Sequence, residues 1–249
     1  MKRFLHNAAV GDCLCQSSSG EAYVVAPSEW GGVPCGDTCV GVVFSLRPAA
    51  FDVAAGYAHG YAVALEDAAC LCQWAADSAW ERRTLFWRRR PRCSEFKNPD
   101  SLFCREGLRN SSVIGNDRDY PAFFAAACSC GPRERRNALR SFLPSAGQWI
   151  EMIENLACVR LSDHSSAVSK EKGLWSCSGN EIAASLNRRF AEIHGASRFL
   201  NGERDIFWSS TPAGNRCAYA LAFYGGQDVV SVSSCAVSSR CRVRAAIAF

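Results

Sequence analysis

The sequence predicts an α+β domain with short strands, two main helices and a C-terminal strand that closes the sheet. Two observations lead to this prediction. Short apolar runs typical of strands lie towards both ends of the chain, whereas the two clearest helical patterns lie between them. In addition, 249 residues with 48% hydrophobic and 21% charged content can form one good core, and this composition is unlike that of disordered chains.

One domain is expected over residues 1–249, with or without a small N-terminal extension in residues 1–39. The chain has no run of 18 or more apolar residues, so no membrane span is predicted. The N-terminus MKRFLHNAAVGDCLC begins with basic residues, as a secretory signal does, but lacks the apolar segment. We therefore expect a protein that stays inside the cell, or leaves it by lysis or as part of a larger assembly.

The first elements are expected to be strands. Residues 40–46 and 61–66 are short apolar runs bounded by glycine and proline, which is typical of strands. A short helix is expected to begin near Pro121. Residues 75–109 have the least regular pattern, which predicts a long loop.

Two longer helices follow. In the stretch SAGQWIEMIENL, Ser145 and Gln148 have the spacing of a capping box, and Trp149, Ile153 and Leu156 share one helical face. In the second stretch, Asn180 is the expected N-cap and Gly195 the expected stop. Its apolar residues also share one face: Ile182, Leu186, Phe190 and Ile193.

From residue 207 onward the pattern returns to strands. AYALAF alternates, YGGQ predicts a turn, and RVRAAIAF predicts a strand that closes the chain. Large apolar residues and arginines flank this region, whereas residues 212–241 are mostly Ala, Gly, Ser, Val and Cys.

The fifteen cysteines are interpreted as reduced thiols. In a secreted chain they would suggest a disulfide framework, but the count is odd and several pairs are only two residues apart. Cys35 and Cys39 have the spacing of half a zinc site, yet no Cys or His cluster completes it. We therefore predict no metal site.

Two basic clusters raise the question of nucleic-acid binding. They are ERRTLFWRRRPRC, which begins at Glu81, and GPRERRNALR, which begins at Gly131. The net charge of +4 is modest for such binders, so a solvated loop with arginine stems over apolar neighbours is favoured. A basic nucleic-acid-binding module is the less favoured alternative.

Several short motifs resemble one protein family. GVVFSL, HGYAVALEDA, GLRNSSVI, FLPSAGQW, FWSST and the terminal RVRAAIAF occur in an order similar to that of gut-bacterial and phage proteins with a C-type lectin-like fold. The resemblance runs from about Gly11 to Phe249. It is closest to the variable proteins of diversity-generating retroelements, in the branch that includes the formylglycine-generating enzymes, whose best-known functional relatives are phage tropism determinants.

This resemblance implies a diversifiable, non-enzymatic surface on a rigid scaffold. In such proteins, the segment between the WSST strand and the terminal strand is rewritten at adenines, and the variable codons never encode Gln, Lys, Glu, Met or Trp. Gln227 is the one such residue between Pro212 and Cys241. Residues 207–249 would be the variable-region-like part, and the expected partner is a protein or glycan on a cell surface, reached from a phage virion or a cell-surface assembly.

The residues of the predicted binding face follow from alternation along the strand. Tyr219, Leu221 and Phe223 are expected to face inward, so the intervening residues face outward. With the neighbouring loops, the predicted ligand-binding residues are Ala213, Gly214, Asn215, Arg216, Cys217, Ala220, Ala222, Tyr224, Gly225, Asp228, Val230, Ser233, Ser234, Cys235, Ala236, Ser238 and Ser239.

The rival class is an enzyme, an oxidoreductase related to the formylglycine-generating enzymes. No motif quoted above carries the cysteines that such enzymes need. The four histidines form no constellation with a nucleophile, and Trp149 and Trp208 are expected in the core. Asp228 is the only acidic residue after Asp205, so no calcium site is expected. We therefore predict no catalytic residues and no cofactor.

Overall fold

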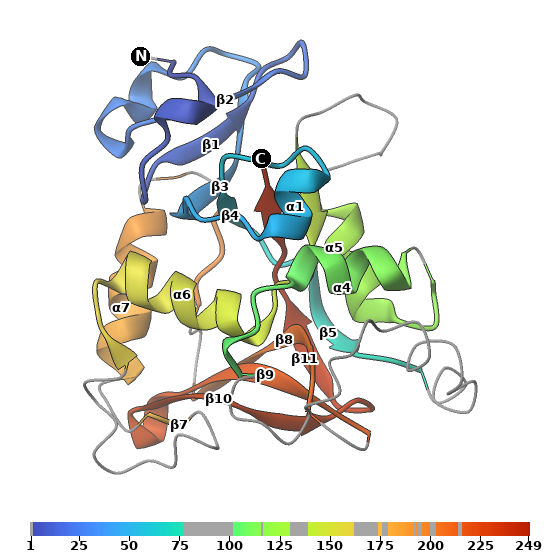
Figure 1. The fold of residues 1–249 in the computed structure, drawn as a ribbon. Coiled ribbons are helices and arrows are strands. Elements are labelled where there is room, and N and C mark those ends of the chain that lie inside the picture. The colour runs from blue at the N-terminus through green and yellow to red at the C-terminus, as the bar shows by residue number, and fades with distance from the viewer. Residues whose placement is uncertain are drawn as a thin grey trace.

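The structure, a computed structural model, describes residues 2–76, 102–115, 117–129, 139–161, 174–175, 179–191, 193, 196–199, 203–213 and 216–249. This part of the chain forms two six-stranded, mostly antiparallel sheets and five α-helices, which confirms the α+β prediction. The first sheet lies at the end of the molecule that carries the N-terminus, and the second lies at the opposite end (Figure 1).

The first sheet joins strands from both ends of the chain. Its strands, in spatial order, are β2 (Ala22–Val25), β1 (Cys13–Gln16), β3 (Thr38–Ser45), β4 (Tyr61–Ala64), β12 (Ala246–Ala248) and β6 (Arg140–Phe142). Both flanks of β12 pair antiparallel, with β4 and with β6. The two ends of the chain therefore meet in one sheet, as expected.

The second sheet contains the predicted variable segment. Its strands, in spatial order, are β5 (Ala69–Gln73), β11 (Arg240–Val243), β8 (Arg204–Pro212), β9 (Cys217–Tyr224), β10 (Val229–Ala236) and β7 (Leu174–Trp175). β11 runs parallel to β8, with Arg242 opposite Phe207. The predicted closing strand is thus divided between the two sheets, because β11 belongs to the second sheet and β12 to the first.

The helices lie on both sides of the molecule between the sheets (Figure 1). They are α1 (Ala50–Ala54), α4 (Gly107–Ile114), α5 (Pro121–Cys128), α6 (Ala146–Ala157) and α7 (Gly179–Ala191), with short 3-10 turns η1 (Leu5–Asn7), η2 (Pro27–Gly32) and η5 (Gly225–Gln227). α5 is the helix expected near Pro121. Of the predicted loop, residues 77–101 lie outside the described residues, and α4 begins before the loop was expected to end.

The capping box predicted for α6 is present. The Gln148 N–H donates to Ser145 Oγ (3.3 Å), and the Ser145 N–H donates in return to Gln148 Oε1 (2.9 Å). Two orphan donors at the helix start are thereby satisfied. The helix ends at Ala157, and the next residue, Cys158, has a left-handed conformation (φ 57°) that closes the last turn.

The start of α7 differs from the prediction. Asn180 was expected to be the N-cap, but the helix begins at Gly179, and the Asn180 N–H donates to Asp228 Oδ1 (2.8 Å). A carboxylate from another strand connection thus takes the capping role, which the positive end of the helix favours. The expected stop, Gly195, lies outside the described residues.

Two hydrophobic clusters cover the sheets. One contains the apolar faces of α6 and α7 together with Phe207, Leu221 and Phe223. The other contains α5 residues together with Trp208 and Ala220. Residues that alternate along β8 and β9 thus enter different clusters, so both faces of these strands are covered.

Candidate functional site

Residues 208–211 of β8 come directly before the predicted variable segment, and we call these four residues the frame. Residues 208–211 are at most 3% exposed. Trp149 Nε1 donates to the carbonyl oxygen of Trp208 (3.0 Å), and the Ala146 N–H donates to Thr211 Oγ1 (3.0 Å). The motifs FLPSAGQW and FWSST are distant in the sequence but are joined by these hydrogen bonds. Trp149 and Trp208, both predicted to lie in the core, are buried.

The other side of this frame is tied to β5 by two indole groups. Trp208 Nε1 donates to the carbonyl oxygen of Cys72 (2.8 Å), and Trp74 Nε1 donates to that of Ser209 (2.8 Å). Both indoles are almost completely buried. Because a buried N–H without a partner is costly, these reciprocal bonds fix the position of β8 against β5.

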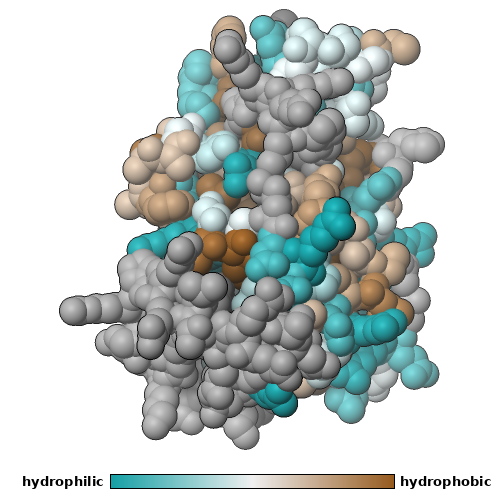
Figure 2. All heavy atoms as spheres, turned by 90° about the vertical axis from the view of Figure 1, so that its right-hand side faces the viewer, coloured by the Kyte–Doolittle hydropathy of each residue, from teal (hydrophilic) through white to brown (hydrophobic). Residues whose placement is uncertain are grey.

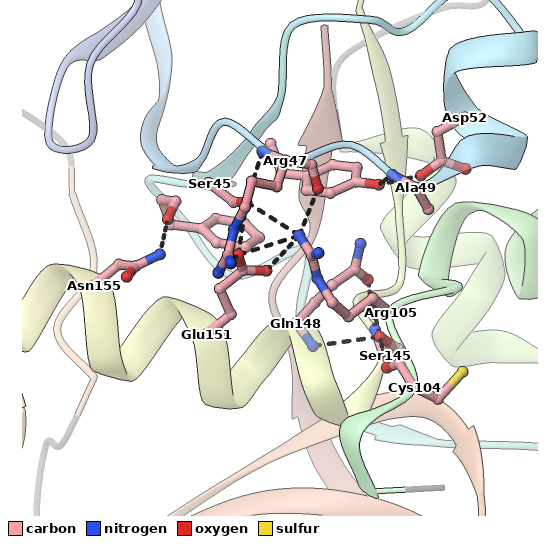
Figure 3. A network of polar contacts seen from close by, with 12 residues as sticks. Ser45, Arg47, Ala49, Asp52, Cys104, Arg105, Ser145, Gln148, Glu151 and Asn155 are labelled. Carbon is pink, nitrogen blue, oxygen red and sulfur yellow. Dashed lines mark hydrogen bonds and ion pairs between the residues drawn. The ribbon is translucent and has the colours of Figure 1, made fainter. Parts of the chain in front are cut away.

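A polar network positions α6, which in turn holds β8 (Figure 3). The buried Glu151 of α6 accepts a hydrogen bond from Ser45 Oγ (2.8 Å) and pairs with Arg105 (2.8 Å) and Arg47 (3.1 Å). Charge-assisted bonds of this kind are stronger than neutral ones. The network therefore anchors α6 both to β3 and to the segment that precedes α4.

Two glycines allow these elements to approach closely. A Cβ atom at Gly147 would lie 2.5 Å from the carbonyl carbon of Phe103, and one at Gly107 would lie 2.2 Å from Gln148 Oε1. Real Cβ atoms do not approach other atoms so closely. The glycine in the LPSAGQW motif thus has a packing role in the support of the frame.

Three residues predicted to face outward are buried, which corrects the predicted binding face. Ala220 and Ala222 are 2% exposed and Val230 is fully buried. Leu221 faces the α6–α7 cluster as expected, but the opposite face of β9 is not free, because Ala220 belongs to the cluster of its register partner Trp208. A small side chain at position 220 fits beside the indole of Trp208, so the small size of Ala220 reflects packing.

The exposed predicted residues gather at one end of the β9–β10 ribbon. The Val237 N–H donates to the Arg216 carbonyl (2.9 Å), and the Ala213 N–H donates to that of Cys217 (2.9 Å), so two connections lie side by side. We call this surface the display end. It comprises the exposed Arg216, Ser234, Ala236 and Ser238 and the half-buried Ala213, Cys217, Ser233, Cys235 and Ser239.

The other predicted residues lie elsewhere. Tyr224, Gly225 and Asp228 belong to the opposite end of the ribbon, about 23 Å away along an eight-residue strand at ~3.3 Å per residue. Tyr224 lies under the Arg204 guanidinium (5.1 Å), and Asp228 caps α7. Residues 214–215, the predicted Gly214 and Asn215, lie outside the described residues.

A concavity of about 610 Å³ adjoins the display end and was not predicted. Its lining comes from β5, the start of β8, the end of β10 with the turn after it, and β11, and it includes Leu71, Arg204, Cys235 and Arg240. Because four separate segments contribute, no local motif marks it. Figure 2 views the molecule from the right-hand side of Figure 1. At the end that holds the second sheet, the residues drawn in colour are mainly hydrophilic.

A buried ion cluster forms part of the wall of this concavity. Arg242 pairs with Asp67 and with Asp205 (2.7 Å), and the completely buried Arg244 also pairs with Asp67 (2.7 Å). The Arg244 guanidinium lies over the Phe199 ring (4.2 Å). Arg242 and Arg244 are therefore compensated by carboxylates.

The described residues also bear on the predictions about metal ions, cysteines, membrane spans and basic clusters. Within the described ranges, no group of three or more His, Cys, Asp or Glu residues is placed to hold a metal. The twelve described cysteines are free thiols. Among the helices that the structure describes, none is long and apolar enough to cross a membrane. The first basic cluster and residues 131–138 of the second lie outside the described residues.

Comparisons with known proteins give one informative similarity. No protein-family model and no curated protein matches the chain. A solved structure of a fimbrial protein from Bacteroides ovatus is similar, with a TM-score of 0.60 and 16% sequence identity. The similarity covers 97% of this chain and 49% of the fimbrial protein, so the chain spans about half that protein's length. At this identity the similarity concerns the fold alone.

Proposed function

We propose that this chain is a non-enzymatic ligand-binding module, with a C-type lectin-like scaffold and a diversifiable surface of the kind found in retroelement variable proteins. The observation that carries the proposal is the separation of frame and surface. The frame, residues 208–211, is at most 3% exposed, whereas Ser234, Ala236 and Ser238 nearby are exposed. Binding surfaces on rigid scaffolds commonly have this arrangement.

The backbone of the display end is held by main-chain bonds. The Ser239 N–H donates to the Ala236 carbonyl (2.8 Å), and Val237 donates to Arg216 across the two connections. Val237 is itself buried and accepts a bond from the Trp74 N–H (3.0 Å). The turn therefore keeps its shape without relying on the side chains of Ser234, Ala236 or Ser238, which are free to vary.

The small size of these exposed side chains gives a shallow, adaptable surface. Arg216 is the large polar residue of the display end, and arginine is among the residues that dominate binding energy at interfaces. The similarity to a fimbrial protein is the basis for the proposed location of the module. We propose that the module acts within a cell-surface or virion assembly and contacts a protein or glycan there.

A display library tests this proposal. Residues Arg216, Ser234, Ala236 and Ser238 are randomised together on the full chain, and variants are selected against an unrelated model protein and an immobilised glycan. We expect folded variants in most of the library and binders to at least one target. Their affinity differences should appear mainly in the dissociation rate, because direct contacts set it.

A matched library tests whether the buried positions of β9 and β10 tolerate variation. It randomises Ala220, Ala222, Val230 and Ser231, which are at most 2% exposed, and we expect most of its members to lose folding. Equal tolerance in the two libraries, or binding that falls steeply with salt and ignores the display end, would contradict the proposal. The second result would favour nucleic-acid binding.

A further inference from the structure

Three arginines line the concavity beside the display end. Arg204 is the first residue of β8 and Arg240 is the first residue of β11, which also carries Arg242. The two strands pair in parallel, with Arg242 opposite Phe207. Because parallel neighbours run in the same direction, the first residues of β8 and β11 lie at the same end of this strand pair. Arg204 and Arg240 therefore belong to the same part of the concavity wall.

The charge of Arg242 is compensated, whereas the charges of Arg204 and Arg240 are not. Arg242 pairs with Asp67 and with Asp205 (2.7 Å). Arg204 and Arg240 are exposed, and neither forms an ion pair with a carboxylate among the residues that the structure describes. The concavity thus presents two guanidinium groups that can pair with an anion from outside.

Arg204 is also held by an aromatic ring. Its guanidinium lies over the ring of Tyr224 (5.1 Å), its register partner on β9. Such stacking uses the face of the planar group, whereas the N–H donors lie in its plane. The donors of Arg204 therefore stay available, and less conformational freedom is lost when they bind an anion.

The rest of the lining indicates which anion fits. The volume of about 610 Å³ is typical of sites for small groups, and Leu71, which is 69% exposed, adds an apolar surface. Among the described residues, no aromatic side chain lines the concavity, although unpaired nucleic-acid bases commonly stack on such side chains. Asp205 in the wall also repels a dense row of negative charges. A carboxylate beside an aliphatic group fits this lining better than a polyanion does.

We infer that the concavity binds an acidic segment of a partner protein. Arg204 and Arg240 pair with its Asp or Glu carboxylates, and Leu71 contacts an aliphatic side chain next to them. Guanidinium groups match carboxylates through two parallel N–H···O bonds, which a lysine cannot make. This site goes beyond ligand display, because neither arginine belongs to the display end, and it does not depend on whether the display end binds a ligand.

A phage-displayed library of random hexapeptides, selected on the immobilised full chain, is the first test. We expect Asp and Glu beside aliphatic residues to be enriched over the unselected library. The double variant Arg204→Gln/Arg240→Gln should lose this enrichment. Arg118→Gln/Arg188→Gln is the matched control and should keep it, because both arginines are exposed elsewhere and Arg118 also lies over an aromatic ring. Selection without acidic enrichment, or equal enrichment with both double variants, would overturn the inference.

Fluorescence anisotropy with the most enriched peptide, labelled with fluorescein, is the second test. Arg204→Gln/Arg240→Gln should weaken binding by about tenfold or more, because it removes hydrogen bonds to charged groups, and circular dichroism checks that this variant is folded. Ser234→Ala/Ser238→Ala should bind the peptide unchanged, which separates this site from ligand display. Unchanged affinity in the arginine variant would overturn the inference. So would tighter, steeply salt-dependent binding of single-stranded DNA or a heparin oligosaccharide at the same arginines, which would assign the site to a polyanion.

Discussion

The frame in β8 and residues 234–239, which form the end of β10 and the turn after it, have opposite relations to solvent. The side chains of residues 208–211 are buried and fixed by bonds to α6 and β5, whereas residues 234–239 alternate between exposed and partly or fully buried. Residues 237–239 are held through their backbone, whereas the frame is held both through its backbone carbonyls and through its buried side chains. This difference indicates where the sequence can change: positions whose side chains are exposed and make no structural contact are open to variation.

The largest expected effect comes from the frame. Trp208→Ala should lower the free energy of unfolding by about 3–5 kcal/mol, because it leaves a cavity and removes the indole bond to Cys72. Chemical denaturation followed by circular dichroism measures this change. Trp30→Ala, at a partly buried indole, is the matched control and should cost clearly less. Similar losses at both positions would show that β8 is not a distinct frame.

A smaller effect is expected on the face that was predicted to be exposed. Ala220→Leu should cost about 1–3 kcal/mol, because the extra methyl groups overpack the cluster that contains Trp208. Ala236→Leu makes the same change at an exposed position and should remain within about 0.5 kcal/mol. If the two variants unfold at the same denaturant concentration, β9 does not have two buried faces.

The support of the frame can be weakened at the start of α6. Ser145→Ala should cost about 1 kcal/mol, because it removes one half of the capping box. Thermal denaturation compares it with Ser112→Ala, a change at an exposed serine in α4 that is expected to have little effect. An unchanged melting temperature for Ser145→Ala would mean that the cap is not needed to hold α6.

The smallest effect is expected at the display end itself. Ser234→Asp should change the free energy of unfolding by no more than about 0.5 kcal/mol, since the residue is exposed. Ser19→Asp, at an exposed position near the other end of the molecule, gives the background for a new surface charge. A loss above 1 kcal/mol at Ser234 alone would mean that the exposed end of β10 contributes to stability as the frame does.

Local signals in the sequence predicted much of this architecture. The capping box of α6 and the strand that contains Trp208 depend on neighbouring residues, so both could be identified. The outward face of β9 could not, because alternation shows which residues share a face but not what covers it. Ala220 is small because it packs in the cluster of Trp208, and the sequence offers no sign of that neighbour.

The same reason explains two other differences. Asp228, a predicted ligand-binding residue, caps a helix that precedes it by almost fifty residues, and this role was not predicted. The concavity beside Cys235 was missed because β5, β8 and β11 each contribute only a few residues to it. In both cases the decisive partner is close in space and distant in sequence.

The position of β12 also affects how the chain reaches its fold. β12 is an interior strand of the first sheet, where Ala248 pairs with Tyr61 on one side and with Arg140 on the other. Synthesis of residues 246–248 must therefore finish before that sheet can form as one piece. Contacts between such distant residues slow folding, and until residues 246–248 pair, the edges of β4 and β6 are open to other chains.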